Sequence, residues 1–158
     1  MKRGILISAL LVICMSGFAQ KSYYFREPQK NITFQVTAGF INYDGMKYGA
    51  SIGMNVKEIF SLSYFMARDY QSAEGSWLDS RLGGIHGTWA VPVNDCVQLA
   101  AGVRIASLNR GFKNEFQSPI YSAEMRMDLN RNLKLAFEYG MSKQTSITSL
   151  RLIFNIRD

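Results

Sequence analysis

From Asn31 onward, apolar and polar residues alternate one by one in segments of about ten residues, and turns separate the segments. The second segment places these residues on its apolar face: Tyr48, Ala50, Ile52, Met54 and Val56. A period of two is typical of β-strands with one apolar face. Eight segments repeat it: Ile32–Tyr43, Lys47–Val56, Ile59–Tyr70, Ser80–Val91, Cys96–Leu108, Tyr121–Leu129, Leu133–Met141 and Ser149–Arg157. The pattern predicts eight β-strands.

The connections differ in length at the two ends of the predicted strands. Asp44-Gly45 is a strong signal for a tight hairpin between the first two strands. Tight turns follow the second, fourth and sixth strands at Asn55–Glu58, Pro92–Asp95 and Asn130–Asn132. Longer loops follow the third and fifth strands at Gln71–Asp79 and Asn109–Ser118. The prolines fall before or between strands, at Pro28, Pro92 and Pro119. This up-and-down meander is typical of outer-membrane barrels.

The polar face favours a narrow lumen over a solvated exterior. Small residues are frequent on it: Gly39, Gly49, Ser51, Gly53, Ser61, Ser63, Gly102 and Gly140. Its charges form a set with both signs: Arg104, Glu124, Arg126, Asp128, Lys134, Glu138 and Arg151. Unpaired charges inside a barrel would be costly, so we expect opposite signs to pair across neighbouring strands as a structural network.

Aromatic residues on the apolar face lie toward strand ends, as in the girdles of membrane barrels: Tyr48, Tyr64, Trp89, Tyr121, Tyr139 and Phe154. Arg68 and Arg81 share that face at the end with the longer loops. We therefore predict an all-β, eight-stranded, antiparallel, up-and-down transmembrane β-barrel. The alternative is a soluble lipocalin-like, ligand-binding barrel, in which the apolar face would point inward.

The N-terminus has the pattern of a cleaved signal peptide. Lys2 and Arg3 precede an apolar stretch, Ile5–Met15, and Gly17-Phe18-Ala19 is typical of a cleavage site. We expect residues 1–19 to be a signal peptide, 20–30 a short periplasmic tail and 31–158 the barrel. Cleavage would lower the formal net charge from +6 to +4, and no cluster of Lys and Arg indicates nucleic-acid binding.

Few residues in the expected mature chain offer catalytic or metal chemistry. Cys96 is its only cysteine and His86 its only histidine, which argues against an internal disulfide and against a Cys/His metal site. We expect no cofactor and no enzymatic activity. His86 could act as a general base toward a serine, as in barrel enzymes that modify lipid A, but no serine adjoins it in the sequence. A position in the lumen or wall is the favoured interpretation.

The longer loops carry aromatic residues that are candidates for contacts with a partner or with lipid: Tyr70, Trp77, Phe112 and Phe116.

The alternating pattern resembles that of the small eight-stranded outer-membrane proteins of the OmpX type and of the OmpA transmembrane domain. This resemblance implies an outer-membrane location, with outer-membrane lipid and lipopolysaccharide, the assembly machinery and an envelope protein as partners. In that family the last strand usually ends in an aromatic residue, whereas Asp158 stands here. The start at Gln20 and the compact chain also look similar to barrels of Bacteroidota and to TraO-type proteins of conjugative transposons.

The function expected from these observations is that of a non-enzymatic outer-membrane protein. It would be a structural or surface-interaction protein, or an accessory subunit of an envelope complex. A component of conjugative transfer, a lipid A-modifying enzyme and a soluble ligand-binding barrel are the alternatives.

Overall fold

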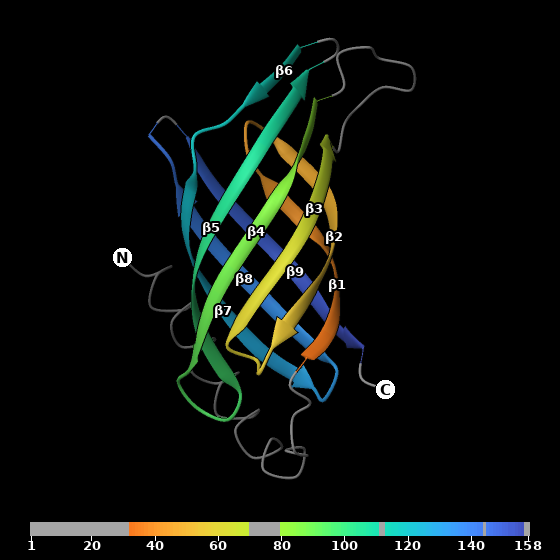
Figure 1. The fold of residues 1–158 in the computed structure, drawn as a ribbon, viewed down its shortest axis with the longest axis vertical. Coiled ribbons are helices and arrows are strands. Elements are labelled where there is room, and N and C mark those ends of the chain that lie inside the picture. Colours follow the sequence, from red (N-terminus) through yellow and green to blue (C-terminus); the bar gives the residue numbers. More distant parts are fainter. Residues whose placement is uncertain (1–31, 70–79, 111–112, 144, 157–158) are drawn as a thin grey trace, which may run out of the picture.

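A computed structural model of the chain describes residues 32–69, 80–110, 113–143 and 145–156, and these residues form strands and turns (Figure 1). The strands are β1 Ile32–Asn42, β2 Met46–Val56, β3 Phe60–Asp69, β4 Ser80–Pro92, β5 Val97–Arg110, β6 Lys113–Phe116, β7 Ile120–Asn130, β8 Leu133–Met141 and β9 Ser146–Ile156. In the described ranges no helix is long and apolar enough to cross a membrane. The expected signal peptide and periplasmic tail lie outside the described residues.

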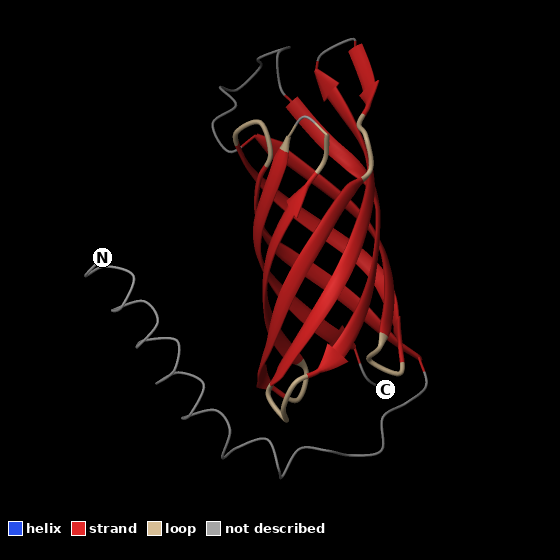
Figure 2. Ribbon diagram, turned by 90° about the vertical axis from the view of Figure 1, so that its left-hand side faces the viewer, coloured by secondary structure: helices blue, strands red, loops and turns tan. Residues whose placement is uncertain are grey.

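Eight long strands close into an antiparallel barrel, as the alternation predicts. The order around the ring is β4-β3-β2-β1-β9-β8-β7-β5, and β4 pairs with β5 to close it. The closing ladder runs from Ser80 opposite Arg110 to Pro92 opposite Gln98. The strands cross the barrel obliquely (Figures 1 and 2). The β2–β3, β4–β5 and β7–β8 turns lie at one end, and the β1–β2 turn and the β5–β6 hairpin lie at the other. We call these the turn end and the loop end.

The segment that was predicted as a loop, Asn109–Ser118, contains a ninth strand. β5 pairs with β7 only up to Arg104, and beyond that residue one edge of β5 lacks a barrel neighbour. β6 folds back and pairs with Ser107–Arg110 of β5, so its backbone supplies hydrogen bonds to that edge. The prediction for Pro92 was also wrong by one residue, because this proline is the last residue of β4. A strand terminus tolerates proline.

The apolar face points outward and the polar face points into the lumen. Burial alternates residue by residue along β1, and large apolar side chains are exposed on every long strand; Ile52 is 65% exposed and Trp89 is 66% exposed. The soluble lipocalin-like alternative is therefore wrong, because it requires the opposite arrangement. Val97 differs from its predicted outward position and is buried, since the β4–β5 turn folds back and the N–H groups of Val93 and Asn94 both donate to its carbonyl.

The tight turns explain how two strand pairs reverse direction. Asp44 and Gly45 have φ of 50° and 105°, a left-handed backbone in the short connection between Asn42 and Met46, which confirms the predicted turn. Lys57 and Glu58 adopt the same conformation, with φ of 53° and 57°, although neither is glycine. Each such residue is strained by about 1–2 kcal/mol. The left-handed backbone places Glu58 at the mouth of the lumen.

Two glycines on β4 differ in how closely the backbone of a neighbour approaches them. A Cβ atom on lumen-facing Gly84 would lie 2.0 Å from the carbonyl oxygen of Ile105, whereas one on outward-facing Gly87 would lie 3.9 Å from Leu62. We expect Gly84→Ala to lower the free energy of unfolding by about 1–3 kcal/mol, as overpacking does. Gly87→Ala should leave it unchanged or raise it slightly. Urea titration in detergent micelles would measure both, and equal effects would contradict this account.

Candidate functional site in the barrel lumen

The middle of the lumen holds five charged side chains that contact one another. Arg104 on β5 donates from Nε to Oε1 of Glu138 on β8 at 2.9 Å, and its Nη2 atom pairs with the other carboxylate oxygen. Arg151 on β9 reaches both acids, at 3.2 Å to Glu138 and through a hydrogen bond to Glu124. Arg126 donates to Glu124 at 2.6 Å. We call these five residues the central cluster.

Strand register explains why the central cluster needs arginines from several strands. Glu124 on β7 stands directly opposite Glu138 on β8. Like charges opposite each other in a sheet repel, and burial strengthens the repulsion. Both carboxylates are fully or almost fully buried. The three arginines lie on the same inward face at nearby levels, so guanidinium groups surround the acidic pair.

Hydroxyl groups complete the hydrogen bonding around the central cluster. Ser149 donates to Glu138 at 2.7 Å. Arg126 donates from Nη2 to Thr88 and, at 3.4 Å, to Ser61. Buried ionic groups are tolerated when most of their donors and acceptors are satisfied in this way. The arrangement is a cross-linked plug that joins strands on opposite sides of the barrel.

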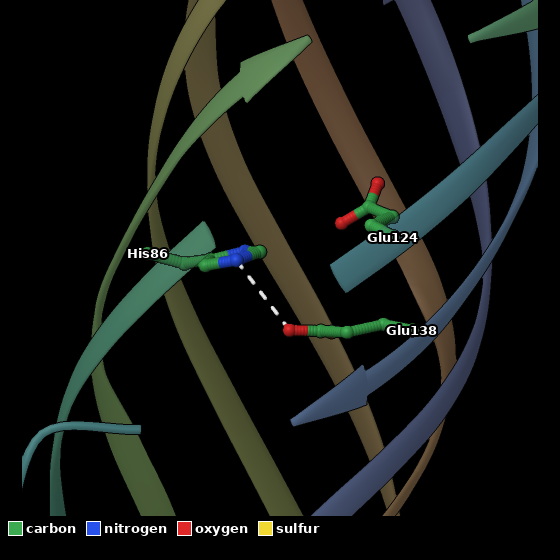
Figure 3. A group of neighbouring side chains, drawn as sticks. All are labelled: His86, Glu124 and Glu138. Atoms are coloured by element: carbon green, nitrogen blue, oxygen red, sulfur yellow. Dashed lines mark ion pairs between the residues drawn. The ribbon is translucent and has the colours of Figure 1, made fainter. Parts of the chain in front are cut away.

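His86 lies inside the barrel beside the two acids (Figure 3). Its Nε2 atom is 3.5 Å from Oε1 of Glu138, and one ligand atom from each of His86, Glu124 and Glu138 lies within 4.8 Å of the others. These are metal-binding residue types, but both carboxylates already bind guanidinium groups. The three arginines of the central cluster would repel a cation bound between His86 and the two acids. These three residues therefore do not fit a metal centre.

The fold also brings a serine to His86 that the sequence analysis missed. A Cβ atom on Gly102 would lie 2.7 Å from Oγ of Ser122 and 2.8 Å from Nε2 of His86, so both atoms border the same small space. Glu138 faces the same Nε2 atom. In a catalytic triad the acid binds the other ring nitrogen, which orients the base toward the nucleophile. The three side chains therefore lack the geometry of a triad.

At the turn end, a second group of charges lies around Lys134. Its Nζ atom is 3.2 Å from Asp128, which belongs to the predicted charge set, and 3.3 Å from Glu58, which does not. Gln98 also donates to Glu58, at 3.4 Å. Glu58 was missed because it falls in a turn, where alternation assigns no face. Its left-handed backbone in the β2–β3 turn places it at the lumen mouth.

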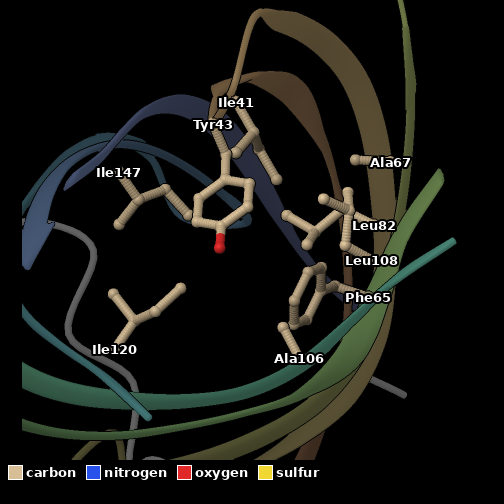
Figure 4. Close-up of a cluster of buried hydrophobic side chains, with 9 residues drawn as sticks. All are labelled: Ile41, Tyr43, Phe65, Ala67, Leu82, Ala106, Leu108, Ile120 and Ile147. Carbon is tan, nitrogen blue, oxygen red and sulfur yellow. The ribbon is translucent and has the colours of Figure 1, made fainter. Parts of the chain in front are cut away.

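At the loop end, the lumen is apolar, which the sequence analysis did not expect (Figure 4). The buried residues are Ile41, Tyr43, Phe65, Ala67, Leu82, Ala106, Leu108, Ile120 and Ile147. We call them the apolar cluster. Phe65 connects it to the central cluster, since the guanidinium carbon of Arg104 is 4.7 Å from the centre of its ring. Lys47 and Asp69 form an ion pair near this end, and Ser80 accepts a hydrogen bond from Lys47 at 3.1 Å.

The residues predicted as an aromatic girdle are all exposed on the outer face: Tyr48, Tyr64, Trp89, Tyr121, Tyr139 and Phe154. Tyr64 differs in height from the expectation, because it lies midway along β3, opposite Ile52 and Ile85. Its hydroxyl group reaches the β4 backbone, 3.9 Å from where a Cβ atom on Gly83 would lie. Alternation fixes the face of a residue, whereas register fixes its height.

Of the candidate loop contacts, Phe116 is described and the others are not. Phe116 is the last residue of β6 and is 83% exposed. Tyr70, Trp77 and Phe112 lie outside the described residues.

Comparisons with known proteins show the fold and no closer relationship. No protein-family model matches the sequence, and no curated protein matches it. The N-terminal β-barrel domain of OprF from Pseudomonas aeruginosa is 15% identical, with a TM-score of 0.60 over 80% of this chain and 98% of that one. The designed transmembrane barrel TMB2.3 is 12% identical, with a TM-score of 0.62 over 84% and 100%.

A third similar structure is the outer-membrane protein Ail from Yersinia pestis in a phospholipid bilayer nanodisc. It is 10% identical, with a TM-score of 0.50 over 78% of this chain and 99% of that one. These proteins are membrane barrels of the same strand number and differ widely in sequence. Together with the outward apolar face, they show that this chain has the fold of an eight-stranded transmembrane β-barrel.

Removing one charge from the central cluster tests whether it holds the barrel together. Glu138→Gln keeps the shape of the side chain but leaves Arg104 and Arg151 with less compensating charge. We expect the free energy of unfolding to fall by about 3–5 kcal/mol, as when one partner of a buried pair is removed. Glu115→Gln on exposed β6 is the matched control and should leave the free energy of unfolding unchanged.

A double-mutant cycle separates this pairing from a general loss of packing. Arg104→Met combined with Glu138→Leu should destabilise the barrel less than the two single changes added together, because neither charge is then left alone. Urea titration followed by tryptophan fluorescence in detergent micelles would measure all variants. Strict additivity would contradict a direct coupling.

Proposed function

We propose that this chain is a non-enzymatic protein of the outer membrane, a closed barrel that acts as a scaffold and presents its loop end to partners. The observation that carries the proposal is the combination of an apolar outer face with a lumen closed by charged and apolar side chains. The apolar outer face suits contact with lipid. The closed ring of strands pairs the backbone N–H and C=O groups with one another, as a water-free environment requires. The similarity to OprF and Ail supports the same environment.

A packed lumen favours a scaffold over a pore. An eight-stranded barrel is just wide enough for its side chains to fill the interior. The central cluster and the apolar cluster occupy successive levels of this lumen. A cavity that remains beside Arg104 and Arg151 has a volume of about 10 Å³. That is room for about one water molecule, not for a continuous aqueous path.

The position of His86 argues against a lipid-modifying enzyme. This residue is 2% exposed and faces the lumen, on the opposite side of the strand from the lipid. Its ring is surrounded by Glu138, Arg104 and the backbone at Gly102. A lipid acyl chain in the bilayer would have to cross the wall of the barrel to reach it.

The loop end carries a surface suited to a partner in the envelope. All four residues of β6 are exposed, and Phe116 places an aromatic ring in solvent between the charges of β6 and the return to β7. Phe116 pairs with Ser107 at the base of the β5–β6 hairpin, and exposed aromatic side chains often anchor protein interfaces. The hairpin lies at the end with the longer connections, which faces the cell exterior in outer-membrane barrels.

Arg68 and Arg81 fit the outer leaflet of such a membrane. They stand directly opposite each other on β3 and β4, on the outward face at the loop end. Both side chains are cationic and face outward at the level of the lipid headgroups. The phosphate groups of lipopolysaccharide are anionic ligands that suit guanidinium groups at this level, which makes this lipid a proposed partner.

Extraction from outer-membrane fractions tests the location and the architecture together. We expect the protein in the outer-membrane fraction, with an N-terminus at Gln20 by mass spectrometry. It should migrate on a detergent gel at different positions before and after boiling, because the closed barrel resists detergent at low temperature. In planar bilayers, it should give no stable conductance. A soluble protein, or a well-defined open channel, would contradict the proposal.

The arginine pair gives a separate test of the lipid partner. Added lipopolysaccharide should stabilise the purified barrel. Replacing Arg68 and Arg81 by Gln should reduce this gain in stability by about 1 kcal/mol for each charge removed from the membrane surface. The control replaces exposed Lys113 on β6, which lies beyond the barrel wall. Thermal unfolding with and without lipopolysaccharide measures the effect. An equal response of all three proteins would exclude the arginine pair as the lipid contact.

A further inference from the structure

A small cavity in the lumen lies beside the central cluster, on the side of β1 and β2. Its wall includes Thr37 and Gly39 of β1, Ser51 of β2, Phe65 of β3, Arg104 and Arg151. The centre of a water-sized particle can move through about 10 Å³ in it, so the cavity has room for a single small particle. Two of the residues in this wall are arginines, and none is acidic. The cavity therefore has a positively charged boundary.

The charges around this cavity do not balance within the central cluster. Three arginines, Arg104, Arg126 and Arg151, face two carboxylates, Glu124 and Glu138. One positive charge remains at the middle of the barrel. An uncompensated charge in a buried, low-dielectric position is costly. The excess negative charge around Lys134 lies at the turn-end mouth, where Asp128 is 30% exposed to solvent and water screens it.

Arg151 has a donor that the described residues do not satisfy. Its Nε–H group is buried and has no hydrogen-bond partner among them, and the side chain is more than nine-tenths buried. The stem of this arginine lies against Gly39, since a Cβ atom there would be 3.0 Å from its Cγ. Nε is two bonds further along the same side chain, and both Gly39 and Arg151 line the cavity.

Two hydroxyl groups on the opposite wall can add another donor. Thr37 and Ser51 lie 2.6 Å apart and share one hydrogen bond, in which either oxygen can donate. Whichever one donates, the proton of the other hydroxyl is left outside that bond. A donor-rich wall with no carboxylate suits an acceptor that carries negative charge.

We infer that this cavity binds one small monovalent anion of the size of chloride. The anion accepts hydrogen bonds from Nε of Arg151 and from the Thr37–Ser51 pair, and it neutralises the excess charge of the central cluster. A divalent oxyanion such as sulfate is too large for the volume. A cation is repelled by both arginines. The binding site is structural, and it joins β1 and β2 to the strands that carry the central cluster.

Halide dependence of stability is the first test, with the purified barrel in detergent micelles. Urea titration would be run in sodium chloride and in sodium gluconate at equal ionic strength. At chloride tenfold above its dissociation constant, the ratio of folded to unfolded protein should rise about elevenfold relative to gluconate. Equal urea midpoints in the two salts would overturn the inference.

A matched pair of variants tests whether negative charge is what the cavity requires. Ser51→Asp supplies a fixed carboxylate in the wall, whereas Ser51→Asn has the same shape and no charge. Ser51→Asp should be insensitive to chloride and should exceed Ser51→Asn in stability when chloride is absent. Ser51→Asn should remain sensitive to chloride. The reverse order of stability would contradict the assignment.

Crystals grown in sodium bromide locate the anion even if the Ser51 variants fail to fold. Anomalous scattering should show a bromide between Arg151 and the Thr37–Ser51 pair. A water molecule in that position, with bromide confined to the protein surface, would show that the cavity is a hydration site and would overturn the inference.

Discussion

The closure of the sheet is the constraint on which the rest of this structure depends. A strand in lipid has no water to satisfy its N–H and C=O groups, so each edge must pair with another strand. The ladder between β4 and β5 removes the last free edge of the barrel wall. Where β5 extends beyond β7, the short strand β6 returns to pair with it. The same demand for backbone hydrogen bonds thus shapes both the wall and the hairpin that projects from it.

Closure with eight strands also determines what the lumen must contain. The interior is narrow, so side chains from facing strands meet across it. Glu138 on β8 contacts arginines from β5 and β9, and Arg126 on β7 reaches hydroxyls on β3 and β4. The contacts of Arg104 with Glu138 and of Arg126 with these hydroxyls join strands that no backbone ladder pairs. Toward the loop end, the apolar cluster packs the lumen, and the Lys47–Asp69 ion pair lies near it.

The functional proposal follows from this division of the molecule. The wall meets lipid and the lumen is packed, and we propose the loop end as a surface where this chain meets a partner. Phe116 and the rest of β6 project there, on a hairpin that is rigidly continuous with β5. The charged residues of the lumen contribute to the stability of the wall that carries this surface. We therefore interpret the charged groups in the described part of the lumen as structural.

The alternation along the chain was sufficient to predict the eight long strands, their antiparallel order and the membrane barrel, whereas the short strand β6 was predicted as a loop. This succeeded because a strand has a side-chain period of two, so each residue is assigned to a face by counting. The signs of the charges, the small residues and the outward aromatics then indicated which face meets lipid. The inward position of Glu124, Arg126 and Glu138 could be read in the same way.

The tertiary structure alone decided the level of each side chain along the barrel and the side chains that it contacts. Counting along a strand does not say that Glu124 stands opposite Glu138, that Tyr64 lies midway along the wall, or that Phe65 reaches Arg104. Those relations depend on register and on the stagger of a closed ring, which link residues far apart in the sequence. Glu58 reaches the lumen through a left-handed turn that has no alternating pattern. The sequence by itself thus determined which face each side chain occupies, whereas closure of the ring decided which side chains meet.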